Sequence, residues 1–578
     1  MAQTIKLADY LFTRLRQLGV ESIFGVPGDY NLQLLDFVEP AGLHWVGTCN
    51  ELNGGYAADA YSRIKGIAAM ITTFGVGELS AINAIAGANA ELAPIVHIVG
   101  TPSRQLQESR ALVHHTFNDG NYRRFAQMHA LVTVAQANIS DPRSAPAQID
   151  NVLEQCLIHH RPVYIEVPID MVGLEVDASR LQTKIAIPTS VDQPTKEKAL
   201  SAVLEKIKAS KKPMILVDGE IRAHGNVDEV HEFIKATNWP TFVASFAKGL
   251  IDETLPNVHG VYQGLVKPEQ MEFVNSCDLV MCFGEHFSTT NSFGRSAVPK
   301  PDVAVSLRAT SVQVGSALFR DLPAKAFLRS VLDQLKGQAV PSTTSYQKAQ
   351  TNGARSVAEL PKDEQIKQDN MHHVISSFLR PGDTVLAETG TAGYVARDFT
   401  LPQNTSYFAH TTWLSIGYML PAALGAAVAR RELLRKAGSD PDSGRTILLI
   451  GDGSLQMTVQ EISTMIREKL NVIILVVNNK GYLIERCIHG WKQAYNDIAN
   501  WRYLEAPKFF GAEEGDYATW QVKTNGELAA ALENPKMKDG RGLRMAELIF
   551  DPDDAPDGLW RMLEVYVGKP RAEIMKGP

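Results

Sequence analysis

The chain has 578 residues, 45% of them hydrophobic, which is ample for several packed cores. At ~150 residues per domain, this length predicts about three or four domains. The formal net charge is −7, from 57 basic and 64 acidic residues, with no long block of one sign. This balance argues against a surface built to bind nucleic acid or an anionic membrane. We therefore expect small molecules and further copies of the chain as partners.

The first 20 residues carry leucines at helical spacing but are too polar for a secretory leader or a membrane-spanning helix. The five cysteines are scattered and form no CxxC motif: Cys49, Cys156, Cys277, Cys282 and Cys487. Such cysteine usage gives no sign of an oxidising compartment. We predict a cytoplasmic protein with buried thiols.

Two stretches rich in proline or polar residues, 187–194 and 338–363, divide the chain into three segments. The predicted domains are 1–186, 195–340 and 360–578. In each of them, apolar runs alternate with helical patterns. The predicted strands include 67–73, 95–99, 214–217, 241–244 and 279–283, and the helices include 50–64 and 226–237. This alternation predicts an α/β fold class, with parallel sheets and right-handed crossovers.

In the third segment, the apolar run 446–450 is followed by Gly451-Asp452-Gly453-Ser454. A second apolar run, 472–477, is followed by Asn478-Asn479. The pattern predicts strand, loop, helix and strand, which places both polar loops at the carboxyl ends of parallel strands. Open α/β sheets bind their ligands at that edge.

The residue types in these loops suit a divalent cation that carries a diphosphate. Asp452, the Asn479 side chain and the Gly481 carbonyl would supply the hard oxygen ligands that Mg²⁺ prefers. Gly453 would let the backbone approach closely, and Ser454 would open a helix whose free N–H groups favour phosphate. A lone GDGS is more often a simple strand-to-helix turn. The paired asparagine one helix and one strand later favours the cation site.

Further segments, in chain order, strengthen this interpretation. They are Gly25–Asn31, Asn50–Asn53, Thr72–Gly77, His114-His115-Thr116, Ala387–Thr391, Trp413–Gly417 and Gly481–Glu485. Together with the GDGS and asparagine motifs, they resemble the thiamine-diphosphate-dependent 2-oxo acid decarboxylases, and among these the fungal pyruvate decarboxylase type. The resemblance covers nearly the whole chain.

The resemblance implies three doubly wound parallel-sheet domains of the thiamine-diphosphate-dependent decarboxylase type. The first domain would hold the cofactor's pyrimidine, the third its diphosphate and Mg²⁺, and the middle one would be non-catalytic or regulatory. The cofactor would lie between two subunits of a homodimer or homotetramer. The implied reaction is the fermentative, non-oxidative conversion of pyruvate to acetaldehyde and carbon dioxide through a thiamine diphosphate ylide.

By the same resemblance, Glu51 would hydrogen-bond a pyrimidine nitrogen and so promote removal of the thiazolium proton. Such a carboxyl needs apolar surroundings that raise its pKa. Read alone, without the surrounding motif, Glu51 is more readily explained as a helix-start acid favoured by the helix dipole. The other implied contacts with the cofactor are Thr389, Thr391, Leu414, Ile416, Gly453, Ser454 and Ile484.

Four side chains would handle the later proton transfers: Asp29, His114, His115 and Glu485. Read alone, Asp29 is a turn residue after Pro27-Gly28, and Glu485 is an ion-pair partner for Arg486. Two other histidine pairs, His159-His160 and His372-His373, lie outside the family motif. We assign them to solvated surface.

By the same resemblance, Ile484 and Ile488 match the family's small aliphatic pocket, which suits a methyl-bearing 2-oxo acid such as pyruvate. Thr290, if it occupies the position of a phenylalanine in fungal relatives, would admit larger 2-oxo acids. The stretch 218–224 lacks the cysteine that some yeast members carry, and Glu91 is followed by Leu92 instead of histidine, so we expect no cysteine-based activation switch. The alternatives are an aryl-pyruvate decarboxylase, a carboligase of the acetolactate synthase type and a non-catalytic protein that retains cofactor affinity.

Overall fold

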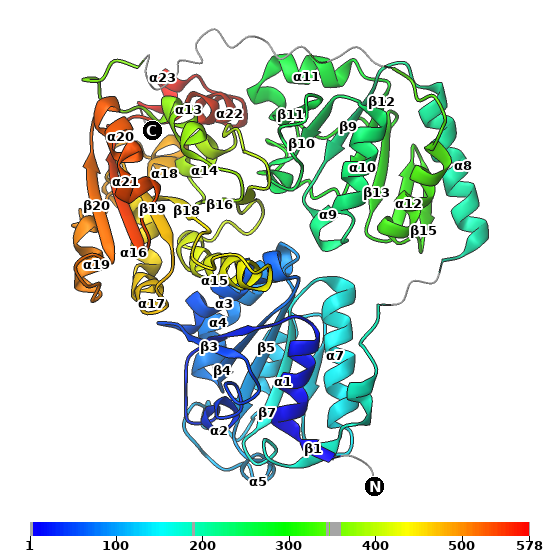
Figure 1. Ribbon diagram of the computed structural model, residues 1–578, viewed down its shortest axis with the longest axis vertical. Helices are drawn as coiled ribbons and strands as arrows, with labels where there is room; N and C mark the ends of the chain where they lie inside the picture. Colours follow the sequence, from blue (N-terminus) through cyan, green and yellow to red (C-terminus); the bar gives the residue numbers. More distant parts are fainter. Residues whose placement is uncertain (1–3, 188–190, 343–345, 347–359, 577–578) are drawn as a thin grey trace.

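The computed structural model of the protein describes residues 4–187, 191–342, 346 and 360–576. It forms three lobes, each built on one β-sheet with helices against it (Figure 1). The amino-terminal lobe lies at the bottom of the view, the middle lobe at the upper right and the carboxyl-terminal lobe at the upper left. The predicted domain limits remain predictions, since parts of both predicted boundaries, 188–190, 343–345 and 347–359, lie outside the described residues.

The amino-terminal sheet has six parallel strands in the order β3-β2-β4-β5-β7-β6. These strands are β2 (Ser22–Gly25), β3 (His44–Gly47), β4 (Ala68–Thr73), β5 (Ile95–Thr101), β6 (Gln136–Asn138) and β7 (Val163–Pro168). The helices are α1 (Leu7–Gln17), α2 (Leu32–Leu35), α3 (Glu51–Lys65), α4 (Val76–Ala90), α5 (Arg104–Glu108), α6 (Arg124–His129) and α7 (Ala145–His159). A separate antiparallel pair joins β1 (Thr4–Lys6) to β8 (Glu175–Asp177).

The carboxyl-terminal sheet repeats this topology, in the order β17-β16-β18-β19-β21-β20, again all parallel. Its strands are β16 (Thr384–Ala387), β17 (Ser406–Phe408), β18 (Thr446–Gly451), β19 (Val472–Asn478), β20 (Tyr517–Val522) and β21 (Leu543–Ile549). Its helices are α13 (Gln368–Phe378), α14 (Thr391–Ala396), α15 (Met419–Lys436), α16 (Asp452–Thr458), α17 (Glu461–Arg467), α18 (Leu483–Ile488), α19 (Ala506–Phe509), α20 (Asn525–Glu533), α21 (Pro535–Lys538), α22 (Asp557–Val567) and α23 (Arg571–Ile574). The shared strand order supports the expectation that the two outer domains are related folds.

The middle sheet differs from the expected purely parallel pattern. Its seven strands, in the order β11-β10-β9-β12-β13-β14-β15, end in two antiparallel pairings. The turn between Arg308 and Ser311 reverses the chain within two residues, which leaves no room for a crossover helix. The strands are β9 (Pro213–Val217), β10 (Thr241–Val243), β11 (Val258–Val261), β12 (Leu279–Phe283), β13 (Ala304–Arg308), β14 (Ser311–Val314) and β15 (Ala317–Arg320). The helices are α8 (Gln193–Ala209), α9 (Glu220–Ala223), α10 (Val227–Thr237), α11 (Pro268–Asn275) and α12 (Ala324–Leu335).

The outer domains share a core in which α3 packs against α15. Small residues allow the close approach: a Cβ atom added at Gly425 of α15 would lie 1.9 Å from the Ala57 carbonyl oxygen of α3. At the start of α3, the Asn50 side chain caps the helix by accepting the Asn53 N–H at 2.9 Å. The first turn of α3, which begins with Glu51, is therefore fixed by a local cap and lies beside a domain interface.

We expect Gly425→Val to destabilise the folded protein, because the new side chain forces α3 and α15 apart. Overpacking of a tight core costs about 1–3 kcal/mol, so the melting temperature should fall by several degrees. Gly173→Ala is the matched control, since a Cβ atom there meets nothing within 4 Å. Equal melting temperatures for both variants would contradict the prediction.

Candidate active site

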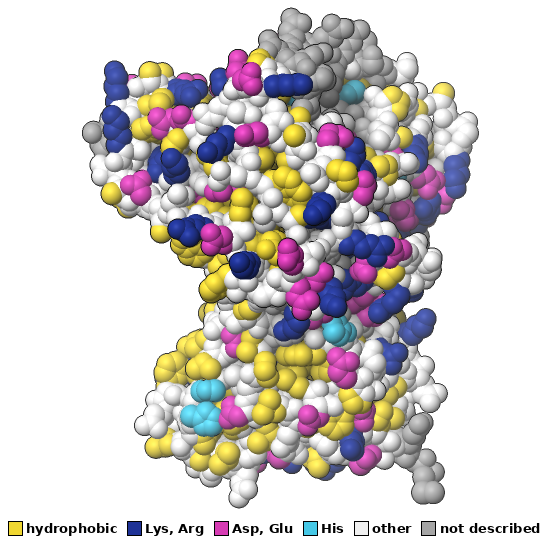
Figure 2. Space-filling view, turned by 60° about the vertical axis from the view of Figure 1, so that its left-hand side comes forward, with side chains coloured by type: hydrophobic (Ala, Val, Ile, Leu, Met, Phe, Trp, Pro, Cys, Tyr) yellow, Lys and Arg dark blue, Asp and Glu magenta, His cyan; other side chains and the backbone are white. Residues whose placement is uncertain are grey.

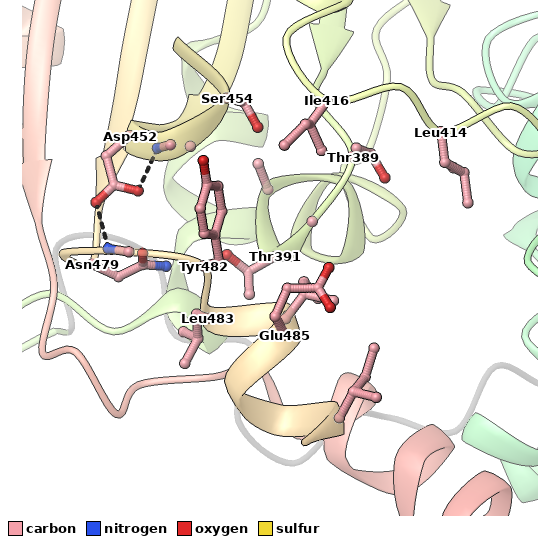
Figure 3. Close-up of a pocket in the computed structure, with 17 residues that line it drawn as sticks. Thr389, Thr391, Leu414, Ile416, Asp452, Ser454, Asn479, Tyr482, Leu483 and Glu485 are labelled. Atoms are coloured by element: carbon pink, nitrogen blue, oxygen red, sulfur yellow. Dashed lines mark hydrogen bonds between the residues drawn. The ribbon is translucent and has the colours of Figure 1, made fainter. Parts of the chain in front are cut away.

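A cavity of about 290 Å³ opens at the carboxyl ends of β16, β18 and β19, in the carboxyl-terminal domain (Figure 3). All of its lining residues lie between Thr389 and Ile488. They include every residue of this domain that the sequence analysis singled out for the cofactor or the metal: Thr389, Thr391, Leu414, Ile416, Asp452, Gly453, Ser454, Asn479, Gly481 and Ile484. The cavity also contains Glu485.

Asp452 begins α16 and is almost fully buried. Its carboxylate accepts the N–H groups of Gly453 at 2.7 Å and Gly481 at 3.1 Å (Figure 3). Burial raises its pKa to about 6 against these stabilising hydrogen bonds. No ion pair joins this carboxylate to a basic side chain of the described residues.

The neighbouring Asn479 is buried, and its Oδ1 atom has no hydrogen-bond partner within the described part of the protein. A buried carboxylate without a basic partner beside an unsatisfied amide oxygen is a donor set that fits a hard divalent cation. Gly481 also lines the cavity, but its carbonyl accepts the N–H of Leu483 at 3.0 Å. Its role as a cation ligand remains a prediction.

The part of the cavity next to Asp452 and Asn479 suits a diphosphate. Gly453 lies against the Tyr482 ring, which a Cβ atom at position 453 would approach to 2.5 Å. Only glycine permits this contact, and it leaves the backbone open toward Ser454 and the cavity. Tyr482 was not assigned a role from the sequence, although it lies within the Gly481–Glu485 segment on which the resemblance rests.

Leu414 and Ile416 reach the cavity from the segment before α15 (Figure 3). Leu414 has a φ of 55°, an uncommon backbone conformation for a leucine that must be held in place by its surroundings. Glu91 of the amino-terminal domain provides such a contact, because its Oε1 atom accepts the N–H groups of Thr411, Thr412 and Trp413 at 2.8–3.1 Å. Sequence reasoning did not find this role of Glu91.

Glu485 is exposed on α18 and points into the cavity (Figure 3). It is not paired with Arg486, whose guanidinium instead contacts Asp497 at 2.8 Å. The ion-pair interpretation of Glu485 is therefore wrong. Ile488, on the same helix, is 47% exposed, an unusual state for an isoleucine that lines a cavity.

Glu51 lies in the amino-terminal domain and begins α3. Burial raises the pKa of its carboxyl. Its Oε1 atom lies so close to Gly77 that a Cβ atom there would be 3.0 Å away. The carboxyl is thus half-buried, and its pKa is shifted in the direction that the resemblance implies.

Asp29, His114 and His115 form a second group in the same domain. His114 Nε2 lies 2.6 Å from Asp29 Oδ2, and the three side chains bring their polar atoms within 4.8 Å of one another. His115 has a φ of 63°, and its carbonyl oxygen would be 2.2 Å from a Cβ atom at Gly75. The turn at 75–77 therefore separates this group from Glu51 and contacts both.

Within one chain, these two sets of residues are not brought together. None of Asp29, Glu51, His114 and His115 lines the cavity that contains Asp452 and Glu485. Thr290 does not line it either. Asp29 and His114 are exposed on the amino-terminal domain, and Ile416 and Ile488 are exposed at the cavity. Figure 2 shows hydrophobic side chains near the narrowing between the amino-terminal lobe and the rest of the molecule.

Some predictions of which side chains are buried and which are exposed were wrong. Cys49 is exposed, although the other four cysteines are buried as predicted. His160 is partly buried, and burial lowers its pKa to about 4. His372 and His373 are also partly buried, because α13 packs their rings against each other at 3.8 Å between centroids.

Three family profiles match the chain in order. They are the thiamine pyrophosphate enzyme N-terminal TPP binding domain over residues 5–123, the central domain over 200–335 and the C-terminal TPP binding domain over 388–541. A pyruvate decarboxylase of Aspergillus parasiticus is 54% identical over 99% of both chains. The chain belongs to the pyruvate decarboxylase family.

Other members of the pyruvate decarboxylase family are also similar over nearly their full length. Pyruvate decarboxylase isozyme 1 of Saccharomyces cerevisiae is 40% identical, over 96% of this chain and 97% of its own. A pyruvate decarboxylase of Aspergillus fumigatus is 41% identical, over 97% and 96%. Each profile falls within one of the three sheet-based domains, and the two cofactor-binding profiles fall on the two domains that carry the candidate residues.

Proposed function

We propose that the protein converts pyruvate to acetaldehyde and carbon dioxide with thiamine diphosphate and Mg²⁺. The observation that carries this proposal is the buried Asp452 carboxylate together with the unsatisfied Asn479 oxygen, both at one cavity in a chain of this family. The bound cofactor would supply the electron-accepting chemistry that releases carbon dioxide.

The chain's own residues would divide the remaining tasks. Asp452, Asn479 and Gly481 would hold the cation, and Gly453 and Ser454 would face the diphosphate. Thr389, Thr391, Leu414, Ile416 and Ile484 would orient the cofactor's rings. Glu51 would share a proton with a pyrimidine nitrogen through its carboxyl oxygens.

Proton transfer to and from the substrate would fall to the second group. His114 Nε2 and Asp29 Oδ2 are close enough, at 2.6 Å, to share a proton. His115 and Glu485 would supply further donors, each contributing roughly 10² to 10⁴ in rate. Ile484 and Ile488 would limit the space to a small 2-oxo acid.

We further propose that a second copy of the chain completes the site. The support is the separation of the two halves within one chain, together with the exposed apolar side chains Ile416 and Ile488 at the cavity. A dimer with two-fold symmetry would apply the amino-terminal half of each subunit to the cavity of the other.

The described residues include no helix long and apolar enough to cross a membrane. As a separate point, we propose a cytoplasmic location for the reaction.

The test is pyruvate-dependent acetaldehyde formation, coupled to alcohol dehydrogenase, after removal and restoration of Mg²⁺ and thiamine diphosphate. Activity that requires both additions would support the proposal. Wild-type protein that binds the cofactor without turnover would overturn it. A scan of larger 2-oxo acids, with detection of acetoin and acetolactate, separates the aryl-pyruvate decarboxylase and carboligase alternatives.

A thiol reagent should not change the dependence of rate on pyruvate concentration. Glu220 occupies the stretch where a regulatory cysteine is found in some yeast members, and it contacts His224 at 3.4 Å and His286 at 3.1 Å. Cys277 and Cys282 of this lobe are both buried, and burial raises the pKa of both thiols. Because Cys49 is exposed, the measurement should be repeated with Cys49→Ser. Sigmoidal kinetics abolished by the reagent in both proteins would contradict this prediction.

A further inference from the structure

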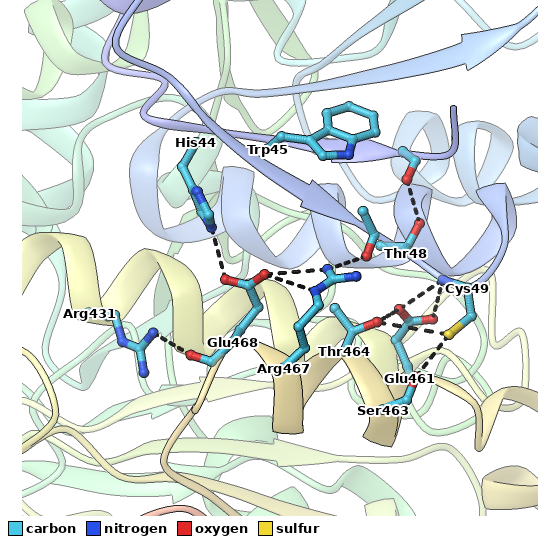
Figure 4. A network of polar contacts seen from close by, with 12 residues as sticks. His44, Trp45, Thr48, Cys49, Arg431, Glu461, Ser463, Thr464, Arg467 and Glu468 are labelled. Atoms are coloured by element: carbon cyan, nitrogen blue, oxygen red, sulfur yellow. Dashed lines mark hydrogen bonds and ion pairs between the residues drawn. The ribbon is translucent and has the colours of Figure 1, made fainter. Parts of the chain in front are cut away.

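One buried acid connects the carboxyl-terminal domain to the start of α3. Glu461 begins α17 and has no exposed surface (Figure 4). Its Oε2 atom accepts the Asn53 side-chain amide at 2.7 Å, and its Oε1 atom accepts the Cys49 backbone N–H at 3.2 Å. The Thr464 hydroxyl also donates to Oε1, at 2.7 Å. Glu461 therefore crosses the domain boundary and satisfies donors in both domains.

The two donors in the amino-terminal domain lie on either side of Glu51. Cys49 precedes it by two residues, and Asn53 follows it by two. Asn53 is fully buried, and its backbone N–H is already bound by the Asn50 cap. The contacts with Glu461 thus fix the backbone before Glu51 and the helical turn after it.

The contacts of Glu461 suit an ionised carboxylate. All three partners are donors, and the amino terminus of α3 adds a favourable dipole. Burial has the larger effect and raises the pKa of this carboxyl overall, and the hydrogen bonds from Thr464, Asn53 and Cys49 oppose that shift. A side chain with fewer acceptor positions would leave a buried donor unsatisfied.

We propose that Glu461 is a positioning residue for Glu51. By holding Cys49 and Asn53, it keeps the first turn of α3 in the orientation that directs the Glu51 carboxyl toward the cofactor. This inference rests on the proposed function, since it assumes that Glu51 handles a cofactor proton. It does not require Glu461 to touch the cofactor.

A nearby ion pair provides a matched control, because it joins the same two domains without contacting the residues next to Glu51. Glu468, near the end of α17, contacts His44 at 2.8 Å across the same boundary (Figure 4). It accepts no hydrogen bond from the residues that flank Glu51. Glu468→Gln should therefore weaken the domain contact without changing the orientation of Glu51.

The experiment compares Glu461→Gln, Glu461→Ala and Glu468→Gln in the full-length protein. Glu461→Gln keeps the volume, but its amide NH₂ group faces one of the donors. A misplacement of about 1 Å can cost ~10²-fold in rate, so we expect kcat to fall about 10²-fold with KM changed by less than about twofold. Exchange of the C2 proton of bound thiamine diphosphate, followed by NMR, should slow by the same factor.

Two further measurements distinguish positioning from a general loss of structure. In the cofactor-free protein, amide hydrogen exchange over residues 48–56 should accelerate in both Glu461 variants and stay unchanged in Glu468→Gln. The double variant with Glu51→Gln should be no slower than Glu51→Gln alone, because residues that act through one another are not additive.

Normal kcat and normal C2 exchange in both Glu461 variants would overturn the inference, and so would losses that multiply with those of Glu51→Gln. An equal effect of Glu468→Gln on kcat would also overturn it. If the wild type is active and Glu51→Gln is equally active, the proposed role of Glu51 fails instead, and the two failures are thereby told apart.

Discussion

Replacing Glu51 with glutamine should lower kcat for pyruvate by about 10² to 10⁴, the usual contribution of a positioned acid or base. Glutamine keeps the size and the hydrogen-bonding capacity of the side chain but cannot exchange a proton with the cofactor. Burial raises the pKa of the Glu51 carboxyl, which is the direction that suits a group that shares a proton with the cofactor. The coupled acetaldehyde assay at saturating cofactor measures the effect.

The control for this prediction is Glu175→Gln, which removes the charge of an exposed acid in β8 of the same domain. It should leave kcat unchanged. Cofactor affinity, measured by titration of the apoprotein, should change far less than kcat in Glu51→Gln. A Glu51→Gln protein with kcat within about twofold of the wild type would show that another group removes the proton.

Asp452→Asn should weaken the binding of Mg²⁺ and thiamine diphosphate by at least about 100-fold, since changes that only reorient metal ligands already cost 10- to 100-fold. The substitution removes the carboxylate charge of Asp452, which lines the same cavity as the unsatisfied Asn479 oxygen. Isothermal titration of the cofactor-free protein, with Asp516→Asn as an exposed control in the same domain, provides the measurement. Equal affinities in the two variants would place the cation elsewhere.

The same site predicts a dependence on pH. Burial raises the pKa of Asp452 to about 6 in the metal-free protein, so the carboxyl takes up a proton as the pH falls through this value. A protonated carboxyl cannot bind a cation, so Mg²⁺ affinity should be full well above pH 6 and fall as the pH decreases through this value. In Asp452→Asn, this particular pH dependence should disappear, which a titration series between pH 5 and 8 would detect.

The amino-acid sequence was sufficient to predict the chemistry of the loops in the carboxyl-terminal domain. Periodicity placed the strands at 446–450 and 472–477 within a residue of their observed ends, because apolar runs bounded by glycine or asparagine leave little choice. It therefore placed Asp452 and Asn479 at one edge of one sheet, where the cavity is found. The family resemblance, rather than spacing alone, separated His114-His115 from the other histidine pairs.

Only the tertiary structure decided which of these residues share a site. Asp29 lies close to His114 and His115, although these residues come from loops far apart in the sequence. The turn at 75–77 separates this group from Glu51. Neither the group nor Glu51 lines the cavity of its own chain. Contacts such as those of Glu91 with residues 411–413 and of Glu461 with Asn53 join different domains. A sequence pattern reports local backbone preference and the side that is buried, whereas these contacts depend on how α3 and α15 pack two separately folded sheets against each other.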